Sequence, residues 1–163
     1  MSVAFSDIAD DFLRIVTDTV YCVATTVDAR GRPRGRILNP VFVVEDGGPR
    51  GWALTGRTPL KTRHLDANPH VSCAFWSPSQ DTVFADCVAS WVAGEGEKEH
   101  VWELFAREPP LGWGAEGVAG WGEERWRSPI FTPLRFEPWR VQVMRGEEYP
   151  SGQLTGRVWR NDG

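Results

Sequence analysis

Short segments rich in β-branched residues, separated by glycine, proline and asparagine, limit this chain to a mainly β fold. Residues 20–27, VYCVATTV, are typical of a strand, and residues 34–44 run back from the turn cluster at residues 28–31. Further strands are expected at residues 51–55, 70–76, 82–94, 130–137, 140–145 and 155–160. Six or more short strands with few helices predict a closed or partly closed antiparallel barrel.

Three helices are expected beside these strands, over residues 7–16, 58–68 and 97–107. The second has the clearest boundaries. Thr58 is typical of an N-cap, Pro59 of the first helical position, and Asn68-Pro69 of a helix end.

The start of that second helix also carries the main chemical signal. Lys61 lies in the first turn, where a cation opposes the helix dipole, and Thr55, Arg57 and Thr58 are adjacent. A helix N-terminus with free N–H groups, hydroxyls and cations is typical of a phosphate site. The alternative is a solvated basic turn on a capped helix.

Composition narrows the class of protein. With 163 residues, 41% hydrophobic and 25% charged, we expect one globular domain spanning residues 1–163. A net charge of −4 gives no basic surface for nucleic acid, and no apolar run is long enough for a membrane span. Nine Trp residues favour flat binding surfaces or a large interface, with core packing as the alternative.

The N-terminus and the cysteines indicate a compartment. The first sixteen residues are acidic and amphipathic, which predicts no signal peptide. Cys22, Cys73 and Cys87 are widely spaced within predicted strands, as expected of buried thiols in a reducing compartment. We therefore expect the cytoplasm.

Motifs for metal binding, nucleophilic catalysis and nucleotide binding are missing from the sequence. His64, His70 and His100 have no cysteine or carboxylate at metal-ligand spacing, so no metal is expected. There is no nucleophile elbow and no phosphate-binding P-loop. A chain without a convincing acid–base pair suits a flavoprotein, because the cofactor supplies the electron chemistry.

Residues 36–75 resemble the FMN-binding split barrels of the pyridoxamine 5'-phosphate oxidase superfamily. Four hallmarks carry the resemblance: Arg36-Ile37-Leu38 on a strand, Thr55 at a strand end, Lys61 on a helix, and Asn68-Pro69-His70-Val71-Ser72. The resemblance implies a mainly β (α+β) fold. The implied fold is a six-stranded antiparallel split β-barrel of Greek-key type with a few short flanking helices.

The resemblance also implies a cofactor site. Arg36 and Lys61 would hold the FMN phosphate, with donors from Thr55 and Thr58, and the strand beside the flavin ring would contribute Ile37, Leu38 and Asn39. Trp139, Arg140 and the loop at residues 112–126 would form walls, supplied across a dimer interface. The complete set of expected cofactor-binding residues is Arg36, Ile37, Leu38, Asn39, Thr55, Gly56, Arg57, Thr58, Lys61, Trp139 and Arg140.

Several positions depart from the vitamin B6 oxidases themselves. Val41 stands where those enzymes have a lysine, and Pro59-Leu60 where they have Ser-Arg. In the C-terminal Arg-x-His-x-Arg motif, Trp159 replaces the histidine and Asn161 the last arginine. These losses predict an uncharacterised branch that does not oxidise pyridoxine phosphates.

Three functions remain open from the sequence. The first is an FMN-dependent oxidoreductase, a homodimer passing hydride between the flavin and a small organic substrate or nicotinamide. The second uses the deazaflavin F420 on the same fold. The third is a non-catalytic protein that binds flavin or haem.

Overall fold

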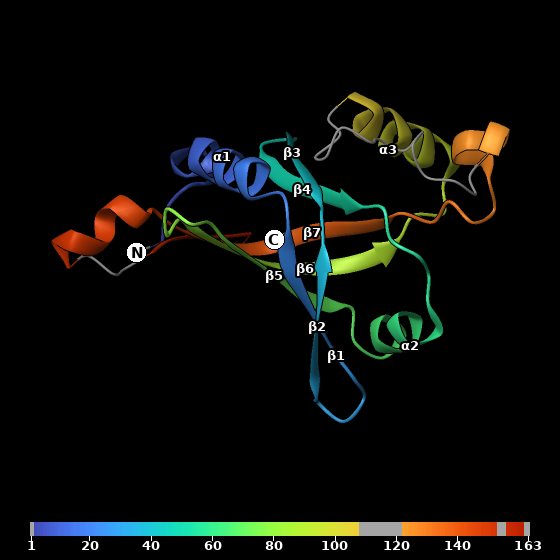
Figure 1. Cartoon of the computed structure of the whole chain (residues 1–163), viewed down its shortest axis with the longest axis horizontal. Coiled ribbons are helices and arrows are strands. Elements are labelled where there is room, and N and C mark those ends of the chain that lie inside the picture. Colours follow the sequence, from blue (N-terminus) through green and yellow to red (C-terminus); the bar gives the residue numbers. More distant parts are fainter. Residues whose placement is uncertain (1, 108–121, 153–155, 162–163) are drawn as a thin grey trace.

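The computed structural model describes residues 2–107, 122–152 and 156–161 of the chain. In these ranges one antiparallel sheet has the strand order β2-β1-β5-β6-β7-β4-β3, with β8 paired to β7 (Figure 1). The strands are β1 (Cys22–Val27), β2 (Pro33–Leu38), β3 (Val41–Glu45), β4 (Gly48–Ala53), β5 (His70–Trp76), β6 (Thr82–Trp91), β7 (Leu134–Met144) and β8 (Arg157–Arg160).

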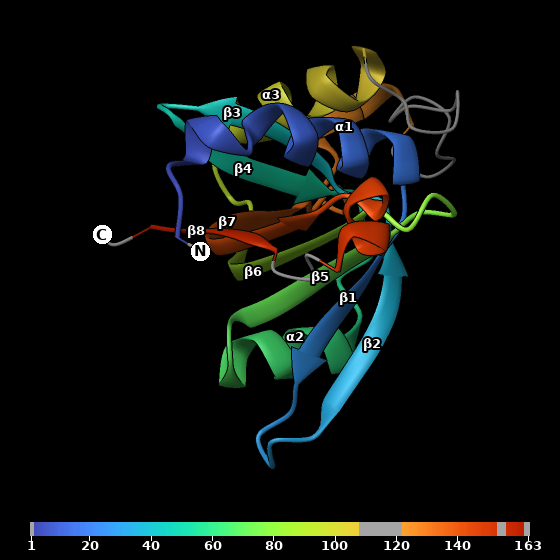
Figure 2. The same cartoon turned by 90° about the vertical axis from the view of Figure 1, so that its left-hand side faces the viewer.

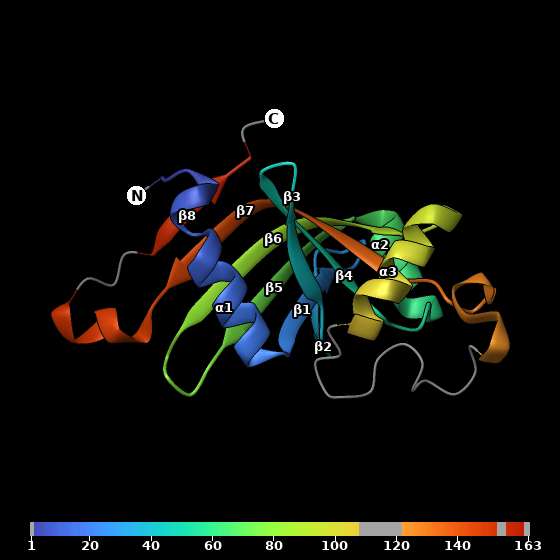
Figure 3. The same cartoon turned by 90° about the horizontal axis from the view of Figure 1, so that it is seen from above.

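Three α-helices flank this sheet. They are α1 (Ala9–Thr19), α2 (Pro59–Ala67) and α3 (Glu95–Arg107), and the shorter 3-10 segments are η1 (Phe5–Asp7), η3 (Gly122–Arg127) and η4 (Gly146–Ser151). Seen from above, α1 crosses the sheet over β5 and β6, whereas α3 lies beside η3 (Figure 3). No helix within the described ranges is long and apolar enough to cross a bilayer.

The link between β2 and β3 determines the shape of the sheet. These strands are the two edges of the sheet, yet only Asn39 and Pro40 separate them in the chain. Three Cα–Cα steps span at most about 11 Å. The sheet must therefore curl until its edges approach, as Figure 2 shows for β2 and the β3–β4 pair. This confirms the antiparallel split-barrel class.

The strand boundaries correct two details of the sequence prediction. The strand expected at residues 34–44 is broken at Asn39–Pro40, because a proline has no N–H to donate to a ladder. Conversely, the two strands expected at residues 130–145 are one, β7, which carries a bulge at Trp139, because Asp86 pairs with Arg140 and Cys87 with Pro138. The barrel has eight strands within the described residues, where the resemblance implied six.

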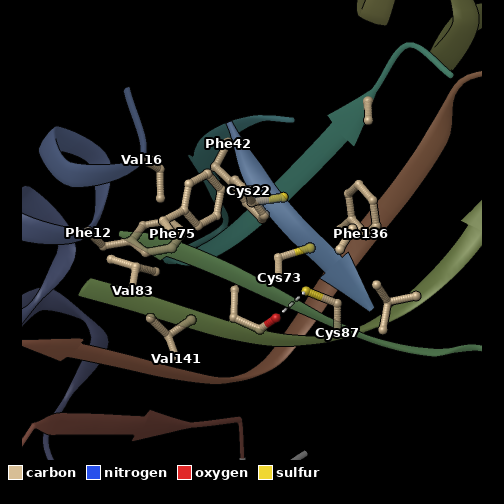
Figure 4. Packing of buried hydrophobic residues seen from close by; sticks show 14 of the residues in the cluster. Phe12, Val16, Cys22, Phe42, Cys73, Phe75, Val83, Cys87, Phe136 and Val141 are labelled. Carbon is tan, nitrogen blue, oxygen red and sulfur yellow. Dashed lines mark hydrogen bonds between the residues drawn. The ribbon is translucent and has the colours of Figure 1, made fainter. Parts of the chain in front are cut away.

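The main core fills the inner face of the sheet, the face that α1 covers. Phe12, Ile15 and Val16 of α1 are buried against it, and Phe42 lies near the centre (Figure 4). The Phe42 ring contacts those of Phe12, Phe75 and Phe136 at centroid distances of 5.3, 6.2 and 6.4 Å. A second apolar cluster joins α3 to the sheet through Trp52, Val92, Val101, Trp102, Phe105, Trp126 and Phe131.

The three cysteines lie in the main core, on β1, β5 and β6 (Figure 4). Cys22, Cys73 and Cys87 are all buried, and none forms a disulfide. A hydrogen bond with Cys73 and burial together raise the pKa of the Cys22 thiol far above its usual range. Their expected burial as free thiols is confirmed, and they act as small apolar side chains.

Gly51 offers a direct test of this packing. A Cβ added to Gly51 would lie 2.5 Å from two atoms of the Phe42 ring, which its aromatic neighbours hold in place. We expect Gly51→Ala to lower the free energy of unfolding in urea by about 1–3 kcal/mol through overpacking. Gly48→Ala, on the same strand but with open space at its Cβ, is the control. Equal stability of the two variants would contradict the packing described for Phe42.

Candidate functional site

The N-terminus of α2 places a lysine in the interior. Thr58 caps the helix by accepting a hydrogen bond from the Lys61 N–H at 3.5 Å, and the Lys61 side chain is only 6% exposed. Its Nζ donates to the hydroxyl of Thr55 and, at 2.8 Å, to the carbonyl of Gly56. Burial, and secondarily the charge of Arg36, lower the pKa of Lys61. The cation is therefore held in a poorly solvated position.

Arg36 reaches the same region from β2. Its Nη1 donates to the Thr26 hydroxyl at 2.6 Å and to the Arg34 carbonyl at 3.3 Å. Its Nη2 is buried and has no hydrogen-bond partner among the described residues. Burial and the neighbouring charge of Arg34 lower the pKa of Arg36. The guanidinium thus retains an unused donor.

Two further polar residues join this site and were not among the sequence candidates. Thr26 on β1 and His64 on α2 are both buried, and the Thr26 Oγ1 lies 2.9 Å from the His64 Nδ1. Two sequence signals could have indicated them. His64 follows Lys61 by three residues and so shares its helix face. Thr26 follows the buried positions Cys22 and Ala24 in the two-residue period of β1.

Trp91, at the end of β6, forms an aromatic wall of the site. The guanidinium carbon of Arg57 lies 5.4 Å from the ring centroid, and the Lys61 Nζ lies 6.0 Å from it. The indole Nε1 is buried without a hydrogen-bond partner among the described residues. Trp91 therefore brings a flat surface and a free donor next to the cations.

The charges at this site are not balanced. Arg36, Arg57 and Lys61, which we call the cationic cluster, form no ion pair with any carboxylate in the described ranges. Some arginines elsewhere are neutralised, as in the pair Arg140–Asp86, where the N–O distance is 3.0 Å. A buried cation such as Lys61 is costly without a counter-charge, so the cluster is suited to an anionic ligand.

The remaining sequence candidates are distributed over other surfaces. Ile37 points from the outer face of β2, away from α1, and is 65% exposed. Leu38 packs on the main core, and Asn39 lies in the β2–β3 link, partly buried. Among the candidates on strand ends and α2, the structure brings Arg36, Thr55, Gly56, Arg57, Thr58 and Lys61 together.

Trp139 and Arg140 are not part of this group within one chain. They lie on β7, and strands β6, β5 and β1 separate them from β2. The Trp139 ring meets that of His70 at a centroid distance of 6.4 Å, and Arg140 binds Asp86 on β6. The loop expected at residues 112–126 falls mostly outside the described residues. Its last residue, Trp126, is buried in the second apolar cluster.

The curled antiparallel sheet with its two nearby edges and buried cations defines a split β-barrel protein. The family model described as "Pyridoxamine 5'-phosphate oxidase" matches residues 8–113, more than half of the chain. The chain belongs to this family. Its matched region contains β1 to β6 and every residue of the cationic cluster.

Solved structures share the same fold at low sequence identity. A Clostridium acetobutylicum protein related to general stress protein 26 has a TM-score of 0.64 and 15% identity, with 96% of each chain covered. An FMN-binding protein from Nostoc punctiforme, described as pyridoxamine 5'-phosphate oxidase-related, has a TM-score of 0.61 and 15% identity over 100% of both chains. General stress protein 26 from Bacillus anthracis has a TM-score of 0.57 and 16% identity, covering 84% of this chain and 94% of that one. No curated protein matches the chain.

The lowered pKa of Lys61 has a consequence for the ligand-free protein. The unfolded chain binds more protons than the folded one at alkaline pH, so Lys61 makes stability rise with pH there. Its unfavourable contribution is fully present at pH 7 and fades as pH approaches the ordinary lysine pKa of about 10.4.

We therefore expect the stability of Lys61→Met, relative to wild type, to be more favourable at pH 7 than at pH 10. Urea unfolding at both pH values measures this difference, and Lys98→Met, at a partly exposed site on α3, serves as the control. A difference that does not change with pH would show that the Lys61 ammonium is as well solvated as an exposed one.

Proposed function

We propose that this chain is an FMN-binding flavoprotein whose cationic cluster holds the cofactor phosphate. The observation that carries this proposal is the burial of Lys61 beside Arg36, with no carboxylate among the described residues to neutralise either. A phosphate dianion would supply the missing negative charge in a poorly hydrated place, where charge-assisted hydrogen bonds are strongest. The FMN-binding description of the Nostoc relative supports the same assignment.

The residues present fit a phosphate and a flat ring. The Arg36 Nη2 is unpartnered, and the Lys61 ammonium, with three N–H groups, donates to two acceptors among the described residues. Thr55 and Thr58 would add hydroxyls at the N-terminus of α2. Ile37, Leu38, Asn39, Gly56 and Arg57 complete the proposed cofactor contacts. When bound, the flavin supplies hydride and electron transfer.

The contacts near the C-terminus argue against oxidation of a vitamin B6 phosphate. Arg157, the one motif arginine that is kept, forms an ion pair with Asp11 at 2.5 Å. Trp159, at the histidine position, packs edge-on against Phe5 with 5.1 Å between centroids. Val41, at the lysine position, packs on the second apolar cluster. The groups that could bind a substrate phosphate are thus replaced or engaged.

We propose that the chain acts as a single-domain oxidoreductase on a small organic substrate or nicotinamide. The same cationic cluster could serve the phosphate of F420. Mass spectrometry of the ligand released from purified protein distinguishes FMN from F420 and from haem. Release of haem, or of a ligand without phosphate, would refute the proposal.

We also propose that the protein is a homodimer joined through the outer face of its sheet. Paired positions on neighbouring strands place Ile37, Val23, Ala74 and Phe84 in one row across this face. Ile37, Val23 and Phe84 are 65%, 43% and 38% exposed, and Trp76 on the same face is 63% exposed. A row of apolar side chains on an exposed sheet face is typical of an interface.

A second copy would suit this face better than another partner, because a two-fold axis pairs such a row with itself. Trp139 and Arg140 also lie on the outer face, next to His70 and Asp86. They can therefore approach a cofactor only across the interface, as walls provided by the second subunit.

The phosphate assignment predicts selective effects of Lys61→Ala. Loss of one charge-assisted hydrogen bond, worth about 1.5–3 kcal/mol, should weaken FMN binding by roughly ten- to a hundredfold. Riboflavin, which lacks the phosphate, should bind both proteins alike. Titration of flavin fluorescence measures all four affinities, with Lys98→Ala as a control. Equal weakening of both ligands, or none, would place the phosphate elsewhere.

The dimer assignment predicts that a charge on the outer face separates the subunits. Phe84→Asp should convert a dimer into a folded monomer, since it places an unpaired carboxylate in the apolar row. Light scattering measures the mass, and circular dichroism checks that the fold is kept. Ile130→Asp, at a site 60% exposed in the turn before β7, should leave the dimer intact. Wild-type protein that is monomeric at micromolar concentration with FMN present would refute the architecture.

A further inference from the structure

A buried chain of hydrogen bonds leads from α2 to the guanidinium of Arg36. The Arg36 Nη1 lies 2.6 Å from the Thr26 Oγ1, and this oxygen lies 2.9 Å from the His64 Nδ1. The chain joins β2, β1 and α2, and Thr26 and His64 are 4% and 7% exposed. Lys61 and His64 occupy the same face of α2. The charge of Lys61 interacts with that of Arg36 directly, whereas His64 is connected to Arg36 through the Thr26 hydroxyl.

The direction of this chain depends on the tautomer of His64. Thr26 Oγ1 accepts from Arg36, which has no acceptor of its own, and the hydroxyl proton is available to His64. In the tautomer that carries its proton on Nε2, the His64 Nδ1 accepts from this hydroxyl. A hydroxyl that donates to an imidazole becomes a better acceptor, so the two hydrogen bonds strengthen each other.

Two other arginines of this protein, Arg140 and Arg157, are held in a different way. Arg140 is fixed by the carboxylate of Asp86, and Arg157 by that of Asp11, so each is positioned and neutralised at once. Arg36 is held by the Thr26 hydroxyl, which in turn lies 2.9 Å from the His64 Nδ1, and neither partner is a carboxylate. Its orientation is determined while its charge stays available.

We propose that His64 is a positioning residue for the phosphate of the cofactor. Acting through the Thr26 hydroxyl, it holds the Arg36 guanidinium in place without a competing negative charge. This inference rests on the proposed function, because it assumes that Arg36 binds the phosphate. It assigns a role to two residues that would not themselves contact the cofactor.

The first experiment compares FMN and riboflavin affinities by flavin fluorescence. His64→Leu and Thr26→Val should each weaken FMN binding about three- to tenfold, because each removes a group that positions Arg36 and not a contact to the phosphate, and should leave riboflavin binding unchanged. His64→Asn, whose Oδ1 can replace the Nδ1 acceptor, and Thr26→Ser, which keeps the hydroxyl, should retain wild-type affinity. These conservative variants keep the test valid if His64→Leu or Thr26→Val fails to fold.

The second experiment asks whether His64 acts through Arg36. In an Arg36→Ala background, His64→Leu should cause no further loss of FMN affinity, because the group that it positions is gone. The proposal would be overturned if His64→Leu lowered FMN affinity equally in the wild-type and Arg36→Ala backgrounds. It would also be overturned if His64→Leu left the preference for FMN over riboflavin unchanged. If wild type itself binds FMN no better than riboflavin, the phosphate site is wrong, and that outcome is distinct from a failure of His64 alone.

Discussion

The two-residue link between β2 and β3 is the constraint on which the rest of this structure depends. It ties together the two edges of the sheet, so the sheet has to curl, and curling creates an inner face that must be filled. Phe12, Ile15 and Val16 of α1 fill that face from one side, and Phe42, the second residue of β3, packs among them. Asn39 and Pro40 thus connect the topology of the sheet to the packing of the core.

The cationic cluster lies where α2 packs against the curled sheet. Residues 54–58 lead from the end of β4 to α2, and α2 lies against β1 near the hairpin that β1 forms with β2 (Figure 2). Lys61 is buried there and Arg36 partly buried, both with neutral partners, while Arg140 and Arg157 have carboxylates. A folded protein tolerates such uncompensated charge where a ligand provides the counter-charge. The arrangement therefore costs stability in the empty protein, and under the proposed function the cofactor phosphate would offset this cost.

The two faces of the sheet have different surroundings: the inner face packs in the core, and the outer face is the proposed subunit interface. The inner face carries the core with its three thiols, and the outer face carries Val23, Ile37 and Phe84 in the open. The position of Trp139 and Arg140 on the outer face connects the proposed cofactor site to the proposed association of subunits.

The sequence by itself determined the barrel class, the N-cap of α2 and the residues on either side of it. These depend on local rules: β-branched runs form strands, Thr-Pro begins a helix, and the family pattern from Arg36 to Ser72 is contiguous in the chain. Tertiary structure decided the break at Asn39–Pro40, the single strand β7, and the contact between Thr26 and His64, which lie 38 residues apart. It also decided that three strands lie between Trp139 and β2. Such contacts depend on how a helix packs on a curled sheet, and no local preference of the residues involved encodes that geometry.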